Sequence, residues 1–428
     1  MTLFVCTNCG YGSASWMGKC PDCGQWNTLV EKPSFAKASK SKPESLKKIS
    51  ITPLKKISSK TKSRKKTGLF EFDRVLGDGF VPGEVILLTG EPGIGKSTLL
   101  LQSLQHLSAL YISGEESAEQ IKDRADRLSV SLDRFLFSND LQVEGIIEGA
   151  MDIKDSLDVI VIDSIQTIYS KDVSGPVGSV SQLKDTAKKL ITFAKQNNIT
   201  IILIGHVTKE GEIAGPKTLE HFVDCVLNFE GEKVSHYRLL RATKNRFGPT
   251  DEIGIFEMKT KGLKEVNNPL VFLEEDRKLE AGKAIVGVLE GKRPLFFEIQ
   301  TLVVPTVLPA PRRVVKGMDY SKVLLLLAVV RKYLNVPLDN FDIYVNVIGG
   351  VSVRSTAADL GLIASLLSSL KNIPLPKGTV FIGEVGLLGE VREIYFEEKI
   401  ISEARRLGFK KLYSSKNSVS VKELRKLI

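Results

Sequence analysis

A phosphate-binding turn is the first feature of this sequence that could do chemistry. Nine successive residues match the spacing in which a glycine is followed, after four residues, by Gly-Lys-Ser/Thr. They are Gly90, Glu91, Pro92, Gly93, Ile94, Gly95, Lys96, Ser97 and Thr98. Glycines let the backbone curl so that successive N–H groups point at phosphate oxygens, and a following helix N-terminus adds partial positive charge. Lys96 would reach the β- and γ-phosphates of ATP, and the Ser97 hydroxyl would complete the shell of a Mg²⁺ ion.

The residues on both sides of this turn fit the same interpretation. Residues 85–88 are all apolar and predict a buried strand, and residues 98–101 open an apolar helix. A chance glycine turn before a helix is the alternative, but the strand–turn–helix context is what a P-loop requires. The sequence therefore predicts a nucleotide site.

A buried acidic residue later in the chain supplies a second part of such a site. Residues 159–162 are all β-branched, and Asp163 follows them directly. This pattern is typical of a central strand whose terminal carboxylate holds Mg²⁺ through water. Many buried strands end in Asp, so the assignment of Asp163 depends on the preceding P-loop.

Two neighbouring carboxylates could orient the water that hydrolysis needs. Glu115 and Glu116 follow the apolar residues 110–112 and precede a helical pattern. We expect that strand to lie beside the P-loop strand, so that Glu115 at its tip would face the γ-phosphate. The alternative is that both glutamates only cap the helix, which would suit Glu116 better. Glu115 is the predicted catalytic base.

Four of the five cysteines form two CxxC pairs near the N-terminus, each followed by glycine. They are Cys6, Cys9, Cys20 and Cys23. Two such turns present four thiolates to one ion and give a closed tetrahedral Zn²⁺ site. Disulfides and redox-active pairs are the competing interpretations, but we expect a cytoplasmic chain, whose thiols stay reduced. A structural zinc site is predicted, and the folding of so small a segment should depend on the metal.

Composition divides the chain into four regions. We expect a zinc-binding head in residues 1–30, a basic linker in 31–66, an ATPase domain in 67–273 and a second αβ block in 274–428. In the third region short β-rich runs alternate with helical patterns, which predicts a parallel sheet wrapped by helices. Residues 32–66 carry thirteen Lys or Arg and one acid, a local charge of +12, so the rest of this +10 chain sums to −2. Such a tether attracts nucleic acid, although a merely solvated linker explains the charge equally well.

No part of the sequence suits a membrane. The longest purely aliphatic run, residues 323–330, is far shorter than the ~20 apolar residues that a membrane span needs. The N-terminus lacks a basic segment followed by an apolar stretch and a cleavage site. We therefore expect a cytoplasmic protein with no membrane partner.

Together these elements resemble a RecA-type core, and two further strings narrow the resemblance. Residues 201–204 resemble the next core strand, after which His206 would sense the γ-phosphate. The pentapeptide 244–248, Lys-Asn-Arg-Phe-Gly, resembles the signature of the RadA/Sms recombination proteins. In RecA-like rings, basic residues here reach the neighbouring subunit's γ-phosphate, and the resemblance gives this role to Lys244 and Arg246. Their spacing puts both on one face of a strand. Without the resemblance they would read as two solvated cations.

Residues from about 284 onward resemble the Lon protease domain. Lon-type proteolysis uses a serine activated by a lysine. The position that matches the serine is Ala357, and Lys399 falls near the matching lysine with a spacing one residue short. Ser355 lies nearby, but the shift would point its side chain elsewhere. We expect a protease fold without protease chemistry, retained for assembly or DNA binding. The small-residue-rich helix around Ala364 and Leu367 would suit packing against another subunit.

The resemblance covers nearly the whole chain and implies its fold class. The implied class is an α/β protein with a RecA-like P-loop ATPase core, an N-terminal Cys₄ zinc ribbon or knuckle and a C-terminal α+β Lon-protease-like domain. The implied activity is that of a DNA-dependent ATPase in a hexameric ring, which translocates on single-stranded DNA and promotes branch migration of recombination intermediates alongside the RecA recombinase. Loops 169–179 and 208–217 would contact the single strand. The alternatives are an ATP-dependent Lon-like protease and a regulatory ring ATPase that binds protein partners.

Overall fold

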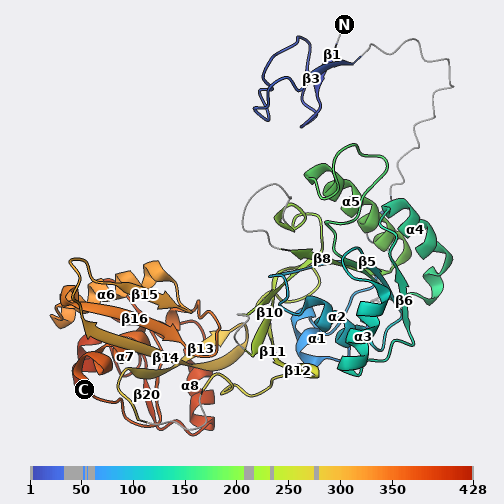
Figure 1. Cartoon of the computed structure of the whole chain (residues 1–428). Coiled ribbons are helices and arrows are strands. Elements are labelled where there is room, and N and C mark those ends of the chain that lie inside the picture. Colours follow the sequence, from blue (N-terminus) through green and yellow to red (C-terminus); the bar gives the residue numbers. More distant parts are fainter. Residues whose placement is uncertain are drawn as a thin grey trace, which may run out of the picture. The chain divides into compact units, whose positions relative to one another are not determined.

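The computed structural model describes most of the chain, and its residues fall into two compact units. The described residues are 3–32, 52–53, 55, 63–206, 216–231, 236–273 and 279–426. The first unit comprises Met1–Thr61 and the second Lys62–Ile428, and both can be followed in Figure 1. Most of the predicted basic linker lies outside the described residues. The four predicted region boundaries stay predictions.

A small antiparallel sheet forms the head. Strand β1 (Leu3–Cys6) pairs with β2 (Gly12–Ser13) on one side and β3 (Leu29–Lys32) on the other. The described core consists of Cys6, Cys20 and Leu29. So few buried apolar groups contribute little to folding, because a segment this small removes only a modest apolar area from water.

A nine-stranded sheet is the centre of the ATPase core in the described part of the chain. Its strands are β4 (Val85–Gly90), β5 (Ala109–Ser113), β6 (Phe135–Ser138), β7 (Val159–Asp163), β8 (Thr200–His206), β9 (Cys225–Glu230), β10 (Tyr237–Asn245), β11 (Ile253–Lys259) and β12 (Gly262–Glu265). The order is β12-β11-β10-β9-β4-β8-β7-β5-β6. The strands from β9 to β6 run parallel, and β10, β11 and β12 add antiparallel pairs at one edge. Every residue of β4, β5 and β7 is buried, as expected of a sheet covered on both faces.

Helices cover both faces of this sheet. They are α1 (Phe70–Leu76), α2 (Lys96–Leu104), α3 (Ala118–Leu128), α4 (Val143–Asp152) and α5 (Val180–Asn197), with short 3₁₀ turns η2 (Lys154–Ser156) and η3 (Pro216–Thr218). Ile86 and Leu88 of β4 share a core with α1, α2 and α3, whereas Val85 and Leu87 share another with α4 and α5. Because alternate residues of β4 enter opposite cores, the predicted helix-wrapped parallel sheet is confirmed. No helix in the described ranges is long and apolar enough to cross a membrane.

The strand order corrects one expectation. We expected β5, which precedes Glu115, to lie beside the P-loop strand β4, but β7 and β8 lie between them. After α2 the chain passes over two strand positions before it forms β5, and the later strands β7 and β8 occupy those positions. Glu115 therefore has to reach the nucleotide site from a strand further along the sheet.

The C-terminal part of the second unit is α+β. Its strands are β13 (Lys283–Glu290), β14 (Arg293–Pro305), β15 (Arg313–Lys316), β16 (Phe341–Val347), β17 (Thr379–Phe381) and β20 (Lys411–Tyr413), with a separate pair β18 (Glu384–Val385) and β19 (Val391–Arg392). The helical elements are α6 (Tyr320–Leu334), η4 (Leu338–Asn340), η5 (Thr356–Ala358), α7 (Asp359–Lys371), α8 (Glu397–Arg406) and η6 (Val421–Lys426). The six-stranded sheet that the described residues form has the order β15-β16-β14-β13-β17-β20. The fold class is confirmed.

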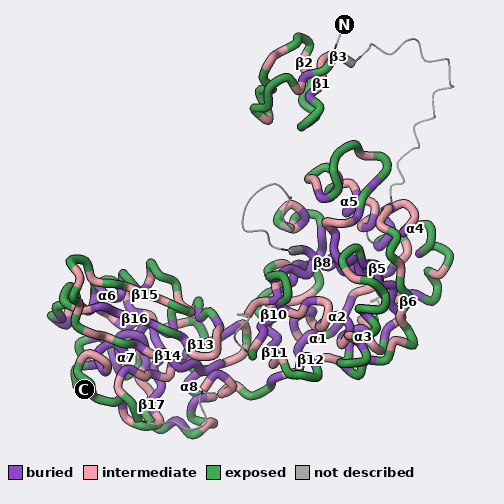
Figure 2. Tube along the Cα trace, in the orientation of Figure 1, coloured by how far each residue is buried: buried purple, intermediate pink, exposed green. Residues whose placement is uncertain are grey.

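Helix α7 is a core helix, which contradicts the expected subunit contact. Ten of its 13 residues are buried, among them Ala364, and Figure 2 shows the burial along this helix and both sheets. A Cβ at Gly361 would lie 2.2 Å from the side chain of Val286, so the glycine lets α7 approach β13 closely. The small residues serve packing inside the domain. The prediction that this helix packs on another subunit is wrong.

Candidate nucleotide site and metal centre

The P-loop connects the carboxyl end of β4 to the start of α2. Gly90 has a φ of 156° and Gly95 a φ of 111°, a region that side chains disfavour. Space is also short: a Cβ on Gly90 would lie 2.5 Å from the carbonyl oxygen of Phe229. Helix α2 begins at Lys96, so its first N–H groups face the loop. The turn has the backbone of a phosphate cradle.

Lys96 lies across the mouth of this turn. Its Nζ donates hydrogen bonds to the carbonyl oxygens of Gly90, at 2.9 Å, and Glu91, at 3.1 Å. Burial lowers the pKa of Lys96, and the carboxylates of Asp163 and Glu115 oppose that shift. A buried ammonium held by two carbonyls at a P-loop can exchange those partners for phosphate oxygens.

Ser97 and Asp163 meet as the predicted magnesium pair. The Ser97 Oγ donates to Asp163 Oδ2 at 2.9 Å, although the residues come from α2 and β7. Tyr111 of β5 donates to the same oxygen at 2.6 Å. Burial raises the pKa of Asp163, and these two hydrogen bonds oppose the shift. A hydroxyl and a carboxylate beside a phosphate cradle are the hard oxygen donors that Mg²⁺ prefers.

The two adjacent glutamates point to different partners. Ser164, next to Asp163, donates its hydroxyl to Glu115 Oε1 at 2.6 Å. The charges of Glu115 and Glu116 both raise the pKa of Asp163, and the charge of Glu115 also opposes the lowering of the pKa of Lys96. Glu116 instead accepts a hydrogen bond from Arg124 of α3 at 2.7 Å. The cap of α3 is neither glutamate.

That cap is Ser117, whose side chain accepts the N–H of Gln120 while Gln120 returns a bond to the N-cap backbone. Sequence reasoning also missed Tyr111 and Ser164, which donate hydrogen bonds to the two candidate carboxylates, Asp163 and Glu115. Ser164 could have been suspected because it follows Asp163, but Tyr111 lies inside an ordinary apolar strand and carries no local signal.

His206 ends β8, where its backbone stands in register with Gly90. That places residue 206 at the P-loop edge of the sheet, where a γ-phosphate sensor would have to be. Its side chain and residues 207–215 lie outside the described residues. The sensor role and the role of loop 208–217 therefore stay predictions.

The P-loop follows the carboxyl end of β4, whereas Lys244 and Arg246 lie at the opposite edge of the sheet, where the parallel strands β4 and β9 begin. Strand β9 runs parallel to β4 with Cys225 opposite Ile86, so the two strands begin together. Lys244 Nζ donates to the carbonyl oxygen of Glu220 at 2.7 Å, just before β9. Arg246 donates to Asp224 Oδ1 at 3.0 Å in the same place. Six strand residues separate this edge from the P-loop, a span of about 20 Å.

The rest of the pentapeptide turns toward α1. The Nδ2 of Asn245 lies 3.3 Å from the carbonyl oxygen of Leu76, and its Oδ1 accepts the N–H of Phe247. A Cβ at Gly248 would lie 2.5 Å from that same carbonyl oxygen. Asn245 and Gly248 therefore fix the turn against the end of α1, and Lys244 and Arg246 face the start of β9.

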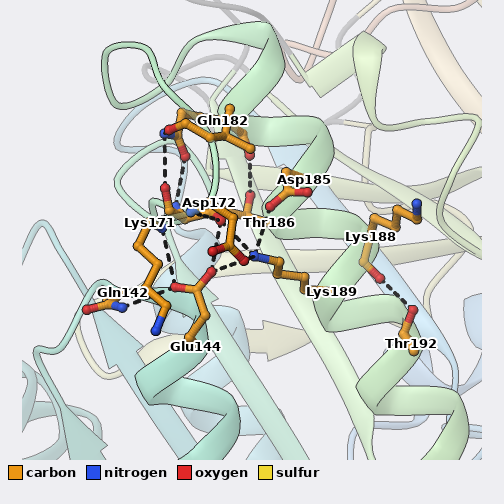
Figure 3. A network of polar contacts seen from close by, with 12 residues as sticks. Gln142, Glu144, Lys171, Asp172, Gln182, Asp185, Thr186, Lys188, Lys189 and Thr192 are labelled. Atoms are coloured by element: carbon orange, nitrogen blue, oxygen red, sulfur yellow. Dashed lines mark hydrogen bonds and ion pairs between the residues drawn. The ribbon is translucent and has the colours of Figure 1, made fainter. Parts of the chain in front are cut away.

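A polar network fixes one of the loops expected to contact single strands, residues 169–179 (Figure 3). Lys189 of α5 donates to Glu144 Oε1 at 2.5 Å and to Asp172 Oδ2 at 2.6 Å. Burial alone would raise the pKa of Glu144, but hydrogen bonds, above all from Lys189, lower it to about 2. The start of the loop is thus anchored to α4 and α5, and Lys171 within it is exposed.

The four head cysteines have the spacing of a zinc site. Their Sγ atoms all lie within 4.8 Å of one another. The distance is 3.7 Å between the sulfurs of Cys6 and Cys23, and 3.6 Å between those of Cys9 and Cys20. A tetrahedron with Zn–S bonds of about 2.3 Å has edges of about 3.8 Å, so the donor set fits Zn²⁺.

The pKa values of two thiols in this cluster are shifted in opposite directions. The Thr28 hydroxyl, 3.2 Å from the sulfur, is the main cause that lowers the pKa of Cys6 to about 6. The N–H of Tyr11 favours the thiolate of Cys9, but burial and the neighbouring sulfurs outweigh it and raise the pKa of Cys9 to about 12. Four thiolates at this spacing need a cation, which supports the metal interpretation.

The position that matches Lon's nucleophile carries no hydroxyl. Ala357 is fully buried, and its carbonyl oxygen accepts the N–H of Gly383 at 2.9 Å. The Ser355 Oγ caps η5 by accepting the N–H of Ala357 at 3.3 Å. Lys399 donates to the carbonyl oxygen of Lys292. These contacts use the serine and the lysine in local structure.

Comparison with known proteins adds two domain matches and a set of close relatives. Residues 4–31 match a family described as rubredoxin metal binding domain, and residues 63–212 match one described as AAA domain. With the cysteine cluster, these matches confirm the predicted cofactors Zn²⁺, ATP and Mg²⁺.

The chain is similar over nearly its whole length to proteins described as DNA repair protein RadA. It is 47% identical to the one from Listeria monocytogenes serovar 1/2a over 424 residues, 97% of this chain and 92% of the relative. It is 46% identical to the one from Bacillus subtilis over 421 residues, 96% and 91% of the two chains. The crystal structure of the RadB recombinase aligns with a TM-score of 0.38 and 23% identity, over 47% of this chain and 99% of that one.

Proposed function

Because the chain belongs to the family of the DNA repair protein RadA, we propose that it is a DNA-dependent ATPase that works as a ring of identical subunits. The family and the ATPase-domain match make it an ATP-hydrolysing DNA repair protein with a RecA-like core. The ring is hexameric and cytoplasmic. It translocates on single-stranded DNA and promotes branch migration of recombination intermediates together with the RecA recombinase.

Each side chain of the nucleotide site has a separate task in this proposal. Lys96 binds the β- and γ-phosphates, and Ser97 and Asp163 hold the Mg²⁺ ion. The metal ion neutralises charge on the phosphates when it is bound. Glu115 accepts a proton from the attacking water and orients it. His206 responds to the presence of the γ-phosphate.

The observation that carries the ring proposal is the place of Lys244 and Arg246. Both lie about 20 Å from the P-loop of their own chain, at the other edge of the sheet. A guanidinium can stabilise a transferring phosphoryl group only in contact with it. A second subunit whose P-loop edge meets this edge would bring the groups together, and repetition of that head-to-tail contact closes a ring.

Mixing two inactive variants tests this arrangement. Lys96→Ala removes the cradle and leaves the arginine, whereas Arg246→Ala does the reverse, and each alone should lose roughly a thousandfold or more of the ATPase rate. In a random mixture, about a quarter of the contacts join an intact cradle to an intact arginine, so activity should recover to that extent. Arg331→Ala is the matched control, because Arg331 is similarly exposed and also pairs with an aspartate. A wild-type rate in an isolated monomer, or no recovery on mixing, would refute the ring.

The DNA part of the proposal has its own test. Single-stranded DNA should raise the ATPase rate, and the stimulation should fall steeply with added salt because phosphate contacts release counterions. A D-loop extension assay should show branch migration by the wild type but not by Lys96→Ala. Absence of stimulation at low salt would favour a regulatory ring that binds protein partners.

Proteolysis is not part of the proposed function. A Lon-type reaction needs a hydroxyl at the position of Ala357, and Ser355 instead caps η5. Digestion of casein that survives Lys96→Ala and is lost in Ser355→Ala would revive the protease alternative.

A further inference from the structure

Asp224 is a buried carboxylate that no step of the proposed mechanism uses. It stands directly before β9, at the edge of the sheet where Lys244 and Arg246 lie. We propose that Asp224 is a positioning residue that holds the Arg246 guanidinium ready for the nucleotide of the neighbouring subunit. This inference rests on the proposed action of Arg246 across the ring.

The contacts of Asp224 hold both the main chain and the side chain of residue 246. Its carbonyl oxygen accepts the Arg246 N–H at 3.0 Å, and its Oδ1 accepts a guanidinium N–H at 3.0 Å. The carboxylate is itself fixed, because Oδ2 accepts the N–H of Val85 at 3.2 Å and the Asp224 N–H bonds to the carbonyl oxygen of the same residue. Arg246 is thus tied to the first residue of the P-loop strand β4.

Burial makes this attachment rigid on one side and leaves the other side open. The side chain of Asp224 is 2% exposed, whereas that of Arg246 is 51% exposed. A guanidinium has five N–H donors in a planar fork, so the bond to Asp224 leaves further donors directed at solvent. A phosphate group could accept those donors with no need to break the bond to Asp224. The rotamers of Arg246 are already restricted before that contact forms.

A second cation, Lys195, also contacts the Asp224 carboxylate, which raises the alternative that Asp224 only neutralises positive charge. Lys195 of α5 lies 3.5 Å from the same Oδ1. If Asp224 only neutralised charge at this edge, Lys195 and Arg246 would be equivalent partners. Asp224 accepts hydrogen bonds from both the main-chain N–H and the guanidinium of Arg246, whereas its contact with Lys195 is a longer ion pair. This difference favours positioning over simple neutralisation.

Substitution of Asp224 should lower the rate and leave ATP binding intact. Asp224→Asn keeps the size of the side chain, removes its charge and leaves one oxygen acceptor, so the side chain can no longer accept from both Arg246 and Val85, and any bond that it keeps to the guanidinium is a weaker neutral one. We expect kcat to fall about tenfold or more and the KM for ATP to stay within about twofold. The reason is that Arg246 contacts the phosphate of another subunit mainly as its charge develops.

Asp158→Asn is the matched control. Asp158 also lies at this edge of the sheet, accepts the N–H of Ser108 at 2.9 Å and pairs with Lys65, but it contacts neither Lys244 nor Arg246 in any described hydrogen bond or ion pair. Its kcat should stay within about twofold of the wild type. Thermal unfolding of both variants shows whether the domain is intact. An equal loss of kcat in both would overturn the positioning role.

Mixing experiments decide whether the defect lies on the arginine side of the contact. Lys96→Ala subunits supply an intact arginine, so adding them to Asp224→Asn should raise activity per total protein, although they are inactive themselves. Arg246→Ala subunits supply none, so adding them should not. The reverse pattern, or wild-type activity of Asp224→Asn alone, would overturn the inference. If Lys96→Ala and Arg246→Ala fail to complement each other, the ring proposal itself fails, and this outcome is distinct from the other two.

Discussion

Replacing each of the two adjacent glutamates tests the assignment of the catalytic base. Glu115→Gln and Glu116→Gln make the same chemical change at neighbouring positions, so each controls for the other. Glu115 accepts the Ser164 hydroxyl at 2.6 Å, beside Asp163, whereas Glu116 pairs with Arg124 of α3. We therefore expect Glu115, rather than Glu116, to take a proton from water at the γ-phosphate.

The expected magnitudes differ by orders of magnitude. A positioned general base contributes about 10²- to 10⁴-fold to a rate, so Glu115→Gln should lower kcat by at least about a hundredfold. The carboxylate of Glu116 and the guanidinium of Arg124 are 27% and 22% exposed, and a partly exposed ion pair of this kind is worth about 1 kcal/mol. Even if all of that were lost at the site, Glu116→Gln would lower kcat only about fivefold.

Single-turnover ATP hydrolysis together with nucleotide binding separates the two cases. Glu115→Gln should bind ATP with nearly wild-type affinity, because its amide can still accept the Ser164 hydroxyl. It should then retain the nucleotide uncleaved. Near-normal turnover by Glu115→Gln, with a hundredfold loss in Glu116→Gln, would refute the assignment of Glu115 as the catalytic base.

Three further predictions concern stability and metal. Burial raises the pKa of Glu84 to about 7, so the folded protein loses stability as the pH rises from the ordinary pKa of a glutamate toward 7. Glu84→Gln should add about 2 to 3 kcal/mol to the free energy of unfolding at pH 8 and almost nothing at pH 4, measured by chemical denaturation. An equal gain at both pH values would contradict the assignment. Both tryptophans lie in the head, so a zinc chelator should change tryptophan fluorescence while the thermal unfolding of the second unit stays the same; an unchanged emission would argue against the metal site. Gly248→Ala places a Cβ 2.5 Å from the Leu76 carbonyl oxygen and should cost about 1 to 3 kcal/mol in denaturant unfolding, whereas Gly149→Ala in α4, with open space around it, should be neutral or mildly stabilising.

The sequence was sufficient wherever the chemistry depends on contiguous residues. A P-loop needs its glycines, lysine and hydroxyl in one turn, and that turn carries its own signal. The same holds for the strand that ends at Asp163 and for the paired cysteines of the head. The strands β4 and β7 and the helix α2 accordingly lie where the pattern predicted them.

Strand order could not be predicted from the pattern. The apolar run of β5 shows that the strand is buried but not which strands flank it, and we placed it next to β4 when β7 and β8 intervene. The contact of Tyr111 with Asp163 spans 52 residues and follows from that order. The bond from Val85 to Asp224 spans 139 residues and was equally invisible. Small residues in α7 misled in another way, because close packing inside one domain and close packing between subunits favour the same residue types.

The signature pentapeptide joins the two kinds of information. Asn245 and Gly248 carry no reactive group, yet the first bonds to the end of α1 and the second leaves room for the Leu76 carbonyl oxygen. If either were replaced, the turn would have to move, and Arg246 would lose its alignment with Asp224 even with its guanidinium intact. Two residues of the motif therefore fix a turn, and the two that we propose to act on the neighbouring nucleotide stand on that turn. Gly248→Ala should therefore lose ATPase activity in the same way as Asp224→Asn. Adding Lys96→Ala subunits, which supply an intact arginine, should raise its activity, and adding Arg246→Ala subunits should not.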